Sequence, residues 1–150
     1  MTMVIAMSDH NRVVNEIKEA FEERGFLVQI RGNNLPREVG RDEAIYRPDM
    51  LVKDRKNGDI VWIVEVETSQ AGKAVVGAAA LAEICMRIEK TEGRQKETPY
   101  LLFVFYTPSA KLQLANKRLK RLFEDGKIEH LRWIEPMHKK QAIEEIRRLD

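Results

Sequence analysis

Acidic residues interrupt two otherwise apolar stretches of this sequence. Residues 61–67 read Val-Trp-Ile-Val-Glu-Val-Glu, and because side chains alternate along a strand, Glu65 and Glu67 are expected on one face. Asp49 follows a proline and precedes a second apolar run. An Asn-Gly pair within residues 54–59 favours a tight turn between the two stretches, which would then pair antiparallel. Three carboxylates are therefore predicted to converge at one place on a sheet.

Such a cluster needs a compensating positive charge, because desolvation and mutual repulsion penalise buried carboxylates. Oxygen ligands favour Mg²⁺ or Mn²⁺ over Zn²⁺, and these ions suit phosphate ester hydrolysis. In the alternative interpretation, Asp49 caps the hairpin while Glu65 and Glu67 pair with lysines on an exposed face. Val61 and Ile63, which alternation puts on the same face, favour the buried, metal-binding interpretation.

The elements that would position these acids follow from hydrophobic periodicity and turn residues. A first helix is expected between Ser8, its N-cap, and Gly25, its stop. Helices are also predicted at residues 71–90, 109–124 and 139–149, and strands at residues 26–30, 46–53, 60–67, 100–106 and 130–134. The strand 100–106 is expected in the middle of the sheet. This order predicts a mixed α/β sheet covered by helices on both faces.

Composition is that of a globular protein. The 150 residues are 43% hydrophobic and 33% charged with a net charge of +2, which predicts one domain over residues 1–150 and leaves nucleic-acid affinity to local clusters. A single cysteine excludes an internal disulfide framework and favours a reducing, cytoplasmic location. No apolar run reaches the length of a membrane span, and the first residues do not resemble a signal peptide.

Other residues capable of chemistry carry weaker signals. The Gly72-Lys73 pair follows a strand, but Ala74 replaces the Ser or Thr of a phosphate-binding loop. Neither metal-ligand spacing nor a partner is evident for three histidines and the cysteine, which are predicted to be structural or surface residues: His10, His130, His138 and Cys85.

Pro48-Asp49, a hairpin turn and Glu65-Val66-Glu67 together resemble the signature of the PD-(D/E)XK nuclease superfamily. The expected order over residues 8–106, helix, three strands, helix, strand, is similar to the αβββαβ core of that family and covers about two thirds of the chain. The resemblance implies a restriction-endonuclease-like core followed by a C-terminal helix-strand-helix extension. Archaeal Holliday-junction resolvases and other small endonucleases of this type are the nearest comparison.

The resemblance also implies roles for the acids. Asp49, Glu65 and the main-chain carbonyl of Val66 would bind Mg²⁺ or Mn²⁺, which polarises the scissile phosphate and activates a water. Glu67 stands where the family usually has lysine, and would bind a second metal or orient that water. Glu16 on the first helix would complete the site, its alternative being an ordinary solvated residue. Lys73 could supply the missing charge, its alternative being a solvent-exposed lysine at a helix start.

Nucleic-acid contacts would come from two basic clusters, one in the loop leading to Asp49 and one on the helix after the fourth strand. Either cluster could instead be a solvated face. The candidates are Arg31, Arg37, Arg41, Arg47, Lys73, Lys111, Lys117, Arg118, Lys120 and Arg121.

The sequence thus predicts a metal-dependent endonuclease, a deoxyribonuclease acting on DNA that is branched or otherwise structured. Because Glu67 replaces the lysine, the alternative is a catalytically inactive nuclease-fold module that binds nucleic acid or a protein partner. A third hypothesis is an α/β interaction domain with no nucleic-acid role. A homodimer is expected of an enzyme that must cut two strands.

Overall fold

A computed structural model describes residues 8–30, 34–39, 44–68, 72–107 and 112–150. In these residues the chain forms a five-stranded mixed sheet and four helices. The helices are α1 (Asp9–Glu23), α2 (Gly72–Thr91), α3 (Leu112–Glu124) and α4 (Lys139–Arg147). The strands are β1 (Leu27–Ile30), β2 (Met50–Lys53), β3 (Ile60–Glu67), β4 (Tyr100–Phe105) and β5 (Met137–His138).

The sheet has the order β1-β2-β3-β4-β5, with β3 at its centre. β1 pairs antiparallel with β2, and β2 pairs antiparallel with β3, whereas β3, β4 and β5 run parallel to one another. The carboxyl ends of these three parallel strands therefore lie at one edge of the sheet, where α/β proteins commonly bind ligands.

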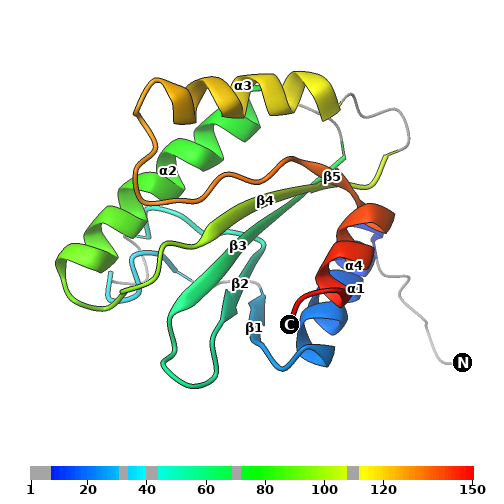
Figure 1. The fold of residues 1–150 in the computed structure, drawn as a ribbon, viewed down its shortest axis with the longest axis horizontal. Coiled ribbons are helices and arrows are strands. Elements are labelled where there is room, and N and C mark those ends of the chain that lie inside the picture. Colours follow the sequence, from blue (N-terminus) through cyan, green and yellow to red (C-terminus); the bar gives the residue numbers. More distant parts are fainter. Residues whose placement is uncertain (1–7, 31–33, 40–43, 69–71, 108–111) are drawn as a thin grey trace, which may run out of the picture.

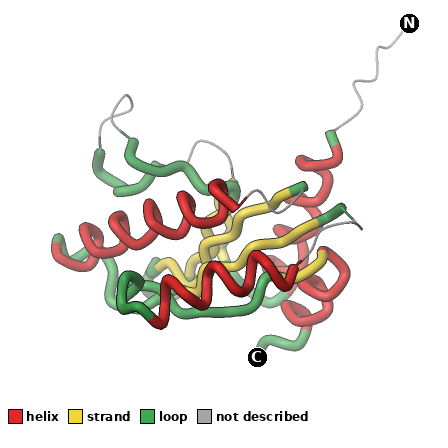
Figure 2. Tube along the Cα trace, turned by 90° about the horizontal axis from the view of Figure 1, so that it is seen from above, coloured by secondary structure: helices red, strands yellow, loops and turns green. Residues whose placement is uncertain are grey.

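Helices cover both faces of the sheet, as predicted, because each face buries an apolar cluster (Figure 1). On one face, α2 and α3 pack over Ile63, Leu101 and Phe103, and Figure 2 shows helices lying over the strands in this layer. On the other face, α1 and α4 pack together over Val64 and Val104. Among the described residues, no helix is long and apolar enough to cross a membrane.

The first helix begins as its sequence predicts. The Ser8 side chain accepts a hydrogen bond from the N–H of Asn11 at 3.2 Å, which satisfies one of the unpaired donors of the first turn. After the helix, Gly25 has a φ of +88°, a left-handed conformation that favours glycine. This cap fixes the start of α1, where His10 lies.

The prediction of one strand over residues 46–53 is wrong, since β2 begins only at Met50. Pro48 has no N–H to donate to a ladder, and Tyr46 makes an isolated bridge with Leu35 instead. The predicted antiparallel pairing of β2 with β3 is confirmed over Met50–Lys53.

A bulge interrupts this pairing near the turn. Val52 faces Trp62, but Lys53 faces Ile60, so Val61 has no partner in the register. Alternation predicts Val61 and Ile63 on one face of the sheet, but in the structure they pack into the clusters on opposite faces.

Two further strand predictions need correction. The predicted strand 130–134 makes only a single bridge, between Arg132 and Tyr100, whereas β5 forms at Met137–His138. Pro136 lacks an N–H, so continuous pairing starts after it. β4 is buried along Leu101–Phe105, as expected, but it is not the central strand. Three strands lie on one side of it and only the short β5 on the other, so β3 occupies the centre of the sheet. The helix predictions are confirmed within the described residues, with residues 71 and 109–111 lying outside them.

Candidate functional site

Asp49 and Glu65 lie against each other where the β2–β3 pairing ends. The main-chain N–H of Asp49 donates to Glu65 Oε1 at 3.1 Å, and Asp49 Oδ2 accepts from the main-chain N–H of Val66 at 2.8 Å. The last backbone pair of the two strands is Met50 with Val64. The carboxylates therefore continue the interstrand hydrogen bonding in place of the backbone, and two of the three predicted acids are brought together.

Tyr46 fixes the orientation of Glu65. Its hydroxyl donates to Glu65 Oε1 at 2.8 Å, and its ring is buried in the cluster beneath α2. The same oxygen of Glu65 thus receives two hydrogen bonds, one from Tyr46 and one from the N–H of Asp49. Sequence patterns give no sign of this contact, because they predict Tyr46 within a strand, whereas in the structure it precedes β2 and bridges to Leu35.

Burial perturbs the ionisation of Glu65. Removal from water is the main cause that raises its pKa, from 4.5 to about 8, and the nearby charge of Asp49 adds to this rise. The hydrogen bonds from Tyr46 and from the Asp49 N–H oppose it. Such a perturbed carboxyl beside a second acid is typical of functional sites, because ordinary structural acids are stabilised in their charged form.

Glu67 lies further along the same strand and is half-buried. Burial raises its pKa, and so does the charge of Asp49, while His10 acts in the opposite direction. Glu67 is therefore electrostatically coupled to Asp49, as the predicted convergence of the three acids requires.

His10 contacts this group, although the sequence had indicated only a structural or surface role for it. Its Nε2 lies 3.3 Å from Asp49 Oδ1, the oxygen that Val66 does not use. Its ring packs edge-on against Tyr106, which directly follows β4, with centroids 6.5 Å apart. The first turn of α1 thus reaches the sheet edge at which the acids gather.

The donor set suits a hard divalent cation. Within the described residues, no three side chains of His, Cys, Asp or Glu are arranged to hold a metal ion. Mg²⁺, however, is commonly bound through one or two carboxylates and keeps several waters. Asp49 and Glu65 offer such a pair. Burial is the main cause of the raised pKa of Glu65, and the charge of Asp49 adds to it; a cation would offset this second cause.

Other residues assigned to this site lie differently. Glu16 pairs with Lys139 at 3.1 Å, so its carboxylate is engaged with α4. Lys73 belongs to the first turn of α2, but its side chain lies outside what the structure describes. The parts assigned to Glu16, Lys73 and the carbonyl of Val66 in metal or phosphate binding stay predictions.

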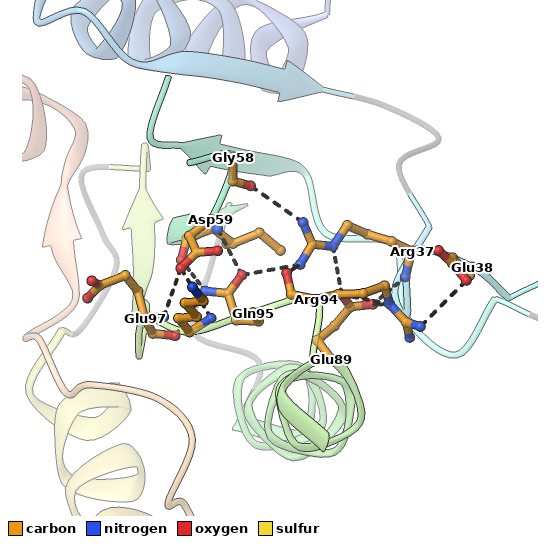
Figure 3. Close-up of polar contacts among 10 residues, drawn as sticks. Arg37, Glu38, Gly58, Asp59, Glu89, Arg94, Gln95 and Glu97 are labelled. Atoms are coloured by element: carbon orange, nitrogen blue, oxygen red, sulfur yellow. Dashed lines mark hydrogen bonds and ion pairs between the residues drawn. The ribbon is translucent and has the colours of Figure 1, made fainter. Parts of the chain in front are cut away.

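Arg37, predicted to contact DNA, takes part in a buried ion-pair network (Figure 3). Its Nε donates to Glu89 Oε2 at 2.6 Å and its main-chain N–H to Glu89 Oε1 at 2.5 Å. Arg94 also pairs with Glu89, which is fully buried. Burial by itself would raise the pKa of Glu89, but the bonds from Arg37 and Arg94 outweigh it and hold that pKa below its usual range. The network ties the loop before β2 to the end of α2.

The remaining basic candidates are spread over the surface. Arg47 is exposed beside the Pro48-Asp49 pair. On α3, Lys117 and Arg118 are exposed, while Lys120 and Arg121 pair with acids one turn later at 3.9 and 3.3 Å. Three candidates lie outside the described residues: Arg31, Arg41 and Lys111.

A basic hollow near the acids escaped the sequence reasoning. It has a volume of about 350 Å³ and lies where β4 and β5 end. Tyr106, the residue that touches His10, lines it, and so do two lysines of the first turn of α4, Lys139 and Lys140. Only the parallel pairing of β4 with β5 brings these lysines near the acids, so no local pattern could have indicated them.

Cys85 and His130, predicted to be structural or surface residues, have structural contacts. Cys85 lies on the inner face of α2 and is fully buried. His130 Nδ1 lies 2.6 Å from Glu83, whose carboxylate also accepts from the N–H groups of Glu129 and His130. This contact attaches α2 to the segment that leads to β5.

Comparison of the chain with protein-family models, with curated proteins and with solved structures gave no match.

Proposed function

We propose that this protein is a metal-dependent endonuclease that hydrolyses DNA phosphodiester bonds, with Asp49 and Glu65 as its central residues. The observation that carries the proposal is the pair of hydrogen bonds that holds these two acids at one edge of the sheet, from the Asp49 N–H to Glu65 and from the Val66 N–H to Asp49. Burial, with a contribution from the charge of Asp49, raises the pKa of Glu65 to about 8. The order of helices and strands also accords with a restriction-endonuclease-like core.

In this reaction, Asp49, Glu65 and Glu67 would have different roles. Asp49 would offer a cation Oδ1, the oxygen that lies 3.3 Å from His10 Nε2, because Oδ2 is held by the Val66 N–H. Tyr46 and the N–H of Asp49 hold Glu65 in a fixed orientation, so that little reorganisation is needed when charge builds up. A bound Mg²⁺ or Mn²⁺ would neutralise charge on the scissile phosphate and lower the pKa of the attacking water. Glu67 would orient that water.

DNA would approach along the carboxyl ends of β3, β4 and β5. Lys140 lies there beside the hollow, where it can contact a phosphate that flanks the scissile one, while the neighbouring Lys139 is paired with Glu16. Lys117 and Arg118 on α3 supply further exposed positive charge. Branched or structured DNA, a second protomer and a cytoplasmic location remain parts of the proposal.

The experiment that tests this function is cleavage of supercoiled plasmid and of a four-way DNA junction with Mg²⁺ or Mn²⁺. The wild type should nick at least one substrate, and Asp49→Ala should not. Lys90→Ala, which removes an exposed lysine from the far end of α2, is the control and should cleave like the wild type. Absence of cleavage by the wild type with either ion would reject the proposal.

The second candidate, a nuclease-fold module that binds without cutting, is favoured by one observation. Glu67 adds a third negative charge where a lysine would have helped the reaction. Retention of labelled DNA by the wild type, with no nicking under any divalent ion, would support this candidate. Failure to bind DNA or RNA at low salt would instead favour an interaction domain without a nucleic-acid role.

A further inference from the structure

His10 and Asp49 form a contact that the sequence did not indicate. His10 Nε2 lies 3.3 Å from Asp49 Oδ1, and the two side chains are 37% and 26% exposed. Solvent therefore reaches this contact, and an ion could enter it without any rearrangement of the core. On the other side of Asp49, Oδ2 is held by the main-chain N–H of Val66.

The two nitrogens of His10 each face an oxygen. Nδ1 lies 3.5 Å from Asn11 Oδ1 and Nε2 lies 3.3 Å from Asp49 Oδ1. A neutral imidazole carries one proton and can donate to only one of these oxygens. If Nδ1 donates to Asn11, the lone pair of Nε2 points at a carboxylate oxygen, and a cation between the two would satisfy both.

This arrangement is typical of metal-binding histidines, which use one ring nitrogen for the ion and donate the other N–H to a nearby oxygen. The position of the ring is also set by packing, because it lies edge-on against Tyr106.

We infer that His10 is a ligand of the divalent ion together with Asp49, so that the site has a mixed nitrogen and oxygen donor set. This inference rests on the proposed function, which supplies the ion. An imidazole ligand raises affinity for transition ions more than for Mg²⁺, which prefers oxygen. The imidazole therefore shifts the preference of this site from Mg²⁺ towards Mn²⁺. The imidazole also brings to the site a donor other than the carboxylates, in a protein that has Glu67 in place of the lysine.

The test is Mn²⁺ binding to the purified full chain, followed by calorimetry and by electron spin-echo spectroscopy, which detects a nitrogen nucleus bound to the ion. The wild type should show the nitrogen signal. His10→Gln should lose it and bind Mn²⁺ about tenfold or more weakly, while its weaker Mg²⁺ binding changes less. His138→Gln, which removes a histidine at the start of α4, is the matched control and should behave like the wild type.

Circular dichroism and thermal unfolding of His10→Gln establish that the variant is folded, so that any loss of Mn²⁺ binding belongs to the site. Mn²⁺ binding by the wild type without a nitrogen signal, or equal binding by His10→Gln, would overturn the inference and leave His10 as an ion-pair partner of Asp49. In that case Asp49-dependent cleavage could still hold, and the proposed function would stand. No Mn²⁺ binding by the wild type would overturn the inference as well, and the cleavage assay with Mg²⁺ would then decide the proposed function separately.

Discussion

The main-chain N–H of Asp49 donates to Glu65 Oε1, and the Asp49 carboxylate accepts from the N–H of Val66, the residue after Glu65. Each acid is thereby held by the strand that carries the other. This reciprocal arrangement uses main-chain N–H donors to hold the two carboxylates together at the sheet edge. It also makes their geometry dependent on the register of β2 against β3, which is set by Met50 facing Val64.

Glu65 should make the stability of the protein depend on pH. Its pKa is about 8 in the folded chain and 4.5 is the ordinary value, so the folded state retains a proton that the unfolded state loses. Stability should therefore fall as pH rises from about 4.5 to about 8, by about 2 to 4 kcal/mol, and then level off. Urea unfolding without divalent ions, from about pH 5 to about pH 9, measures this.

Glu65→Gln removes the titrating group and should flatten that pH dependence, with higher stability than the wild type at about pH 9. Glu129→Gln, a change on a surface segment, is the control and should preserve the wild-type slope. A wild-type curve that does not fall over this range would show that Glu65 ionises normally in the folded protein.

Tyr46→Phe should raise the pKa of Glu65 beyond about 8, because the hydroxyl bond is one of the interactions that lower it. The loss of stability should be larger above that pH, where the bond is made to a charged carboxylate and is worth about 1.5 to 3 kcal/mol. Carbon-13 NMR titration of the Glu65 carboxyl, with urea unfolding at two pH values, checks both effects. An unchanged Glu65 titration would contradict the positioning of Glu65 by Tyr46.

Arg37→Ala should destabilise the protein by about 3 to 5 kcal/mol, because it leaves the buried carboxylate of Glu89 with only part of its compensation. Arg118→Ala, at an exposed position of α3, is the matched control and should change stability by less than about 0.5 kcal/mol. Urea unfolding of the two variants separates a structural arginine from a surface one. Equal stability of the two would mean that the network in Figure 3 contributes little.

The double change Lys117→Ala with Arg118→Ala should weaken DNA binding uniformly across sequences and reduce the slope of log affinity against log salt by about 2. Lys140→Ala should reduce that slope by about 1, if the hollow beside Tyr106 holds a phosphate. Fluorescence anisotropy with a labelled oligonucleotide in EDTA measures binding without cleavage. An unchanged slope for the double variant would remove α3 from the DNA-binding surface.

The sequence alone was sufficient to place Asp49 and Glu65 together. Alternation along a strand and an Asn-Gly turn are local features, and between them they fix which side chains of a hairpin share a face. The same local signals predicted the capped start of α1 at Ser8 and the full extent of β3. These local signals predicted strand boundaries less well near Pro48 and Pro136. Proline has no N–H for the strand ladder, so β2 and β5 begin only after these residues.

Only the tertiary structure decided what surrounds the two acids. His10 meets Asp49 because α1 packs across the sheet with its first turn at the edge where β3 and β4 end, and Lys139 reaches the same region because β5 pairs with β4. Arg37, predicted for DNA, instead found Glu89, a residue 52 positions away. The local sequence around a residue cannot predict such contacts, because these contacts depend on how separate helices and strands bury their apolar faces against one another.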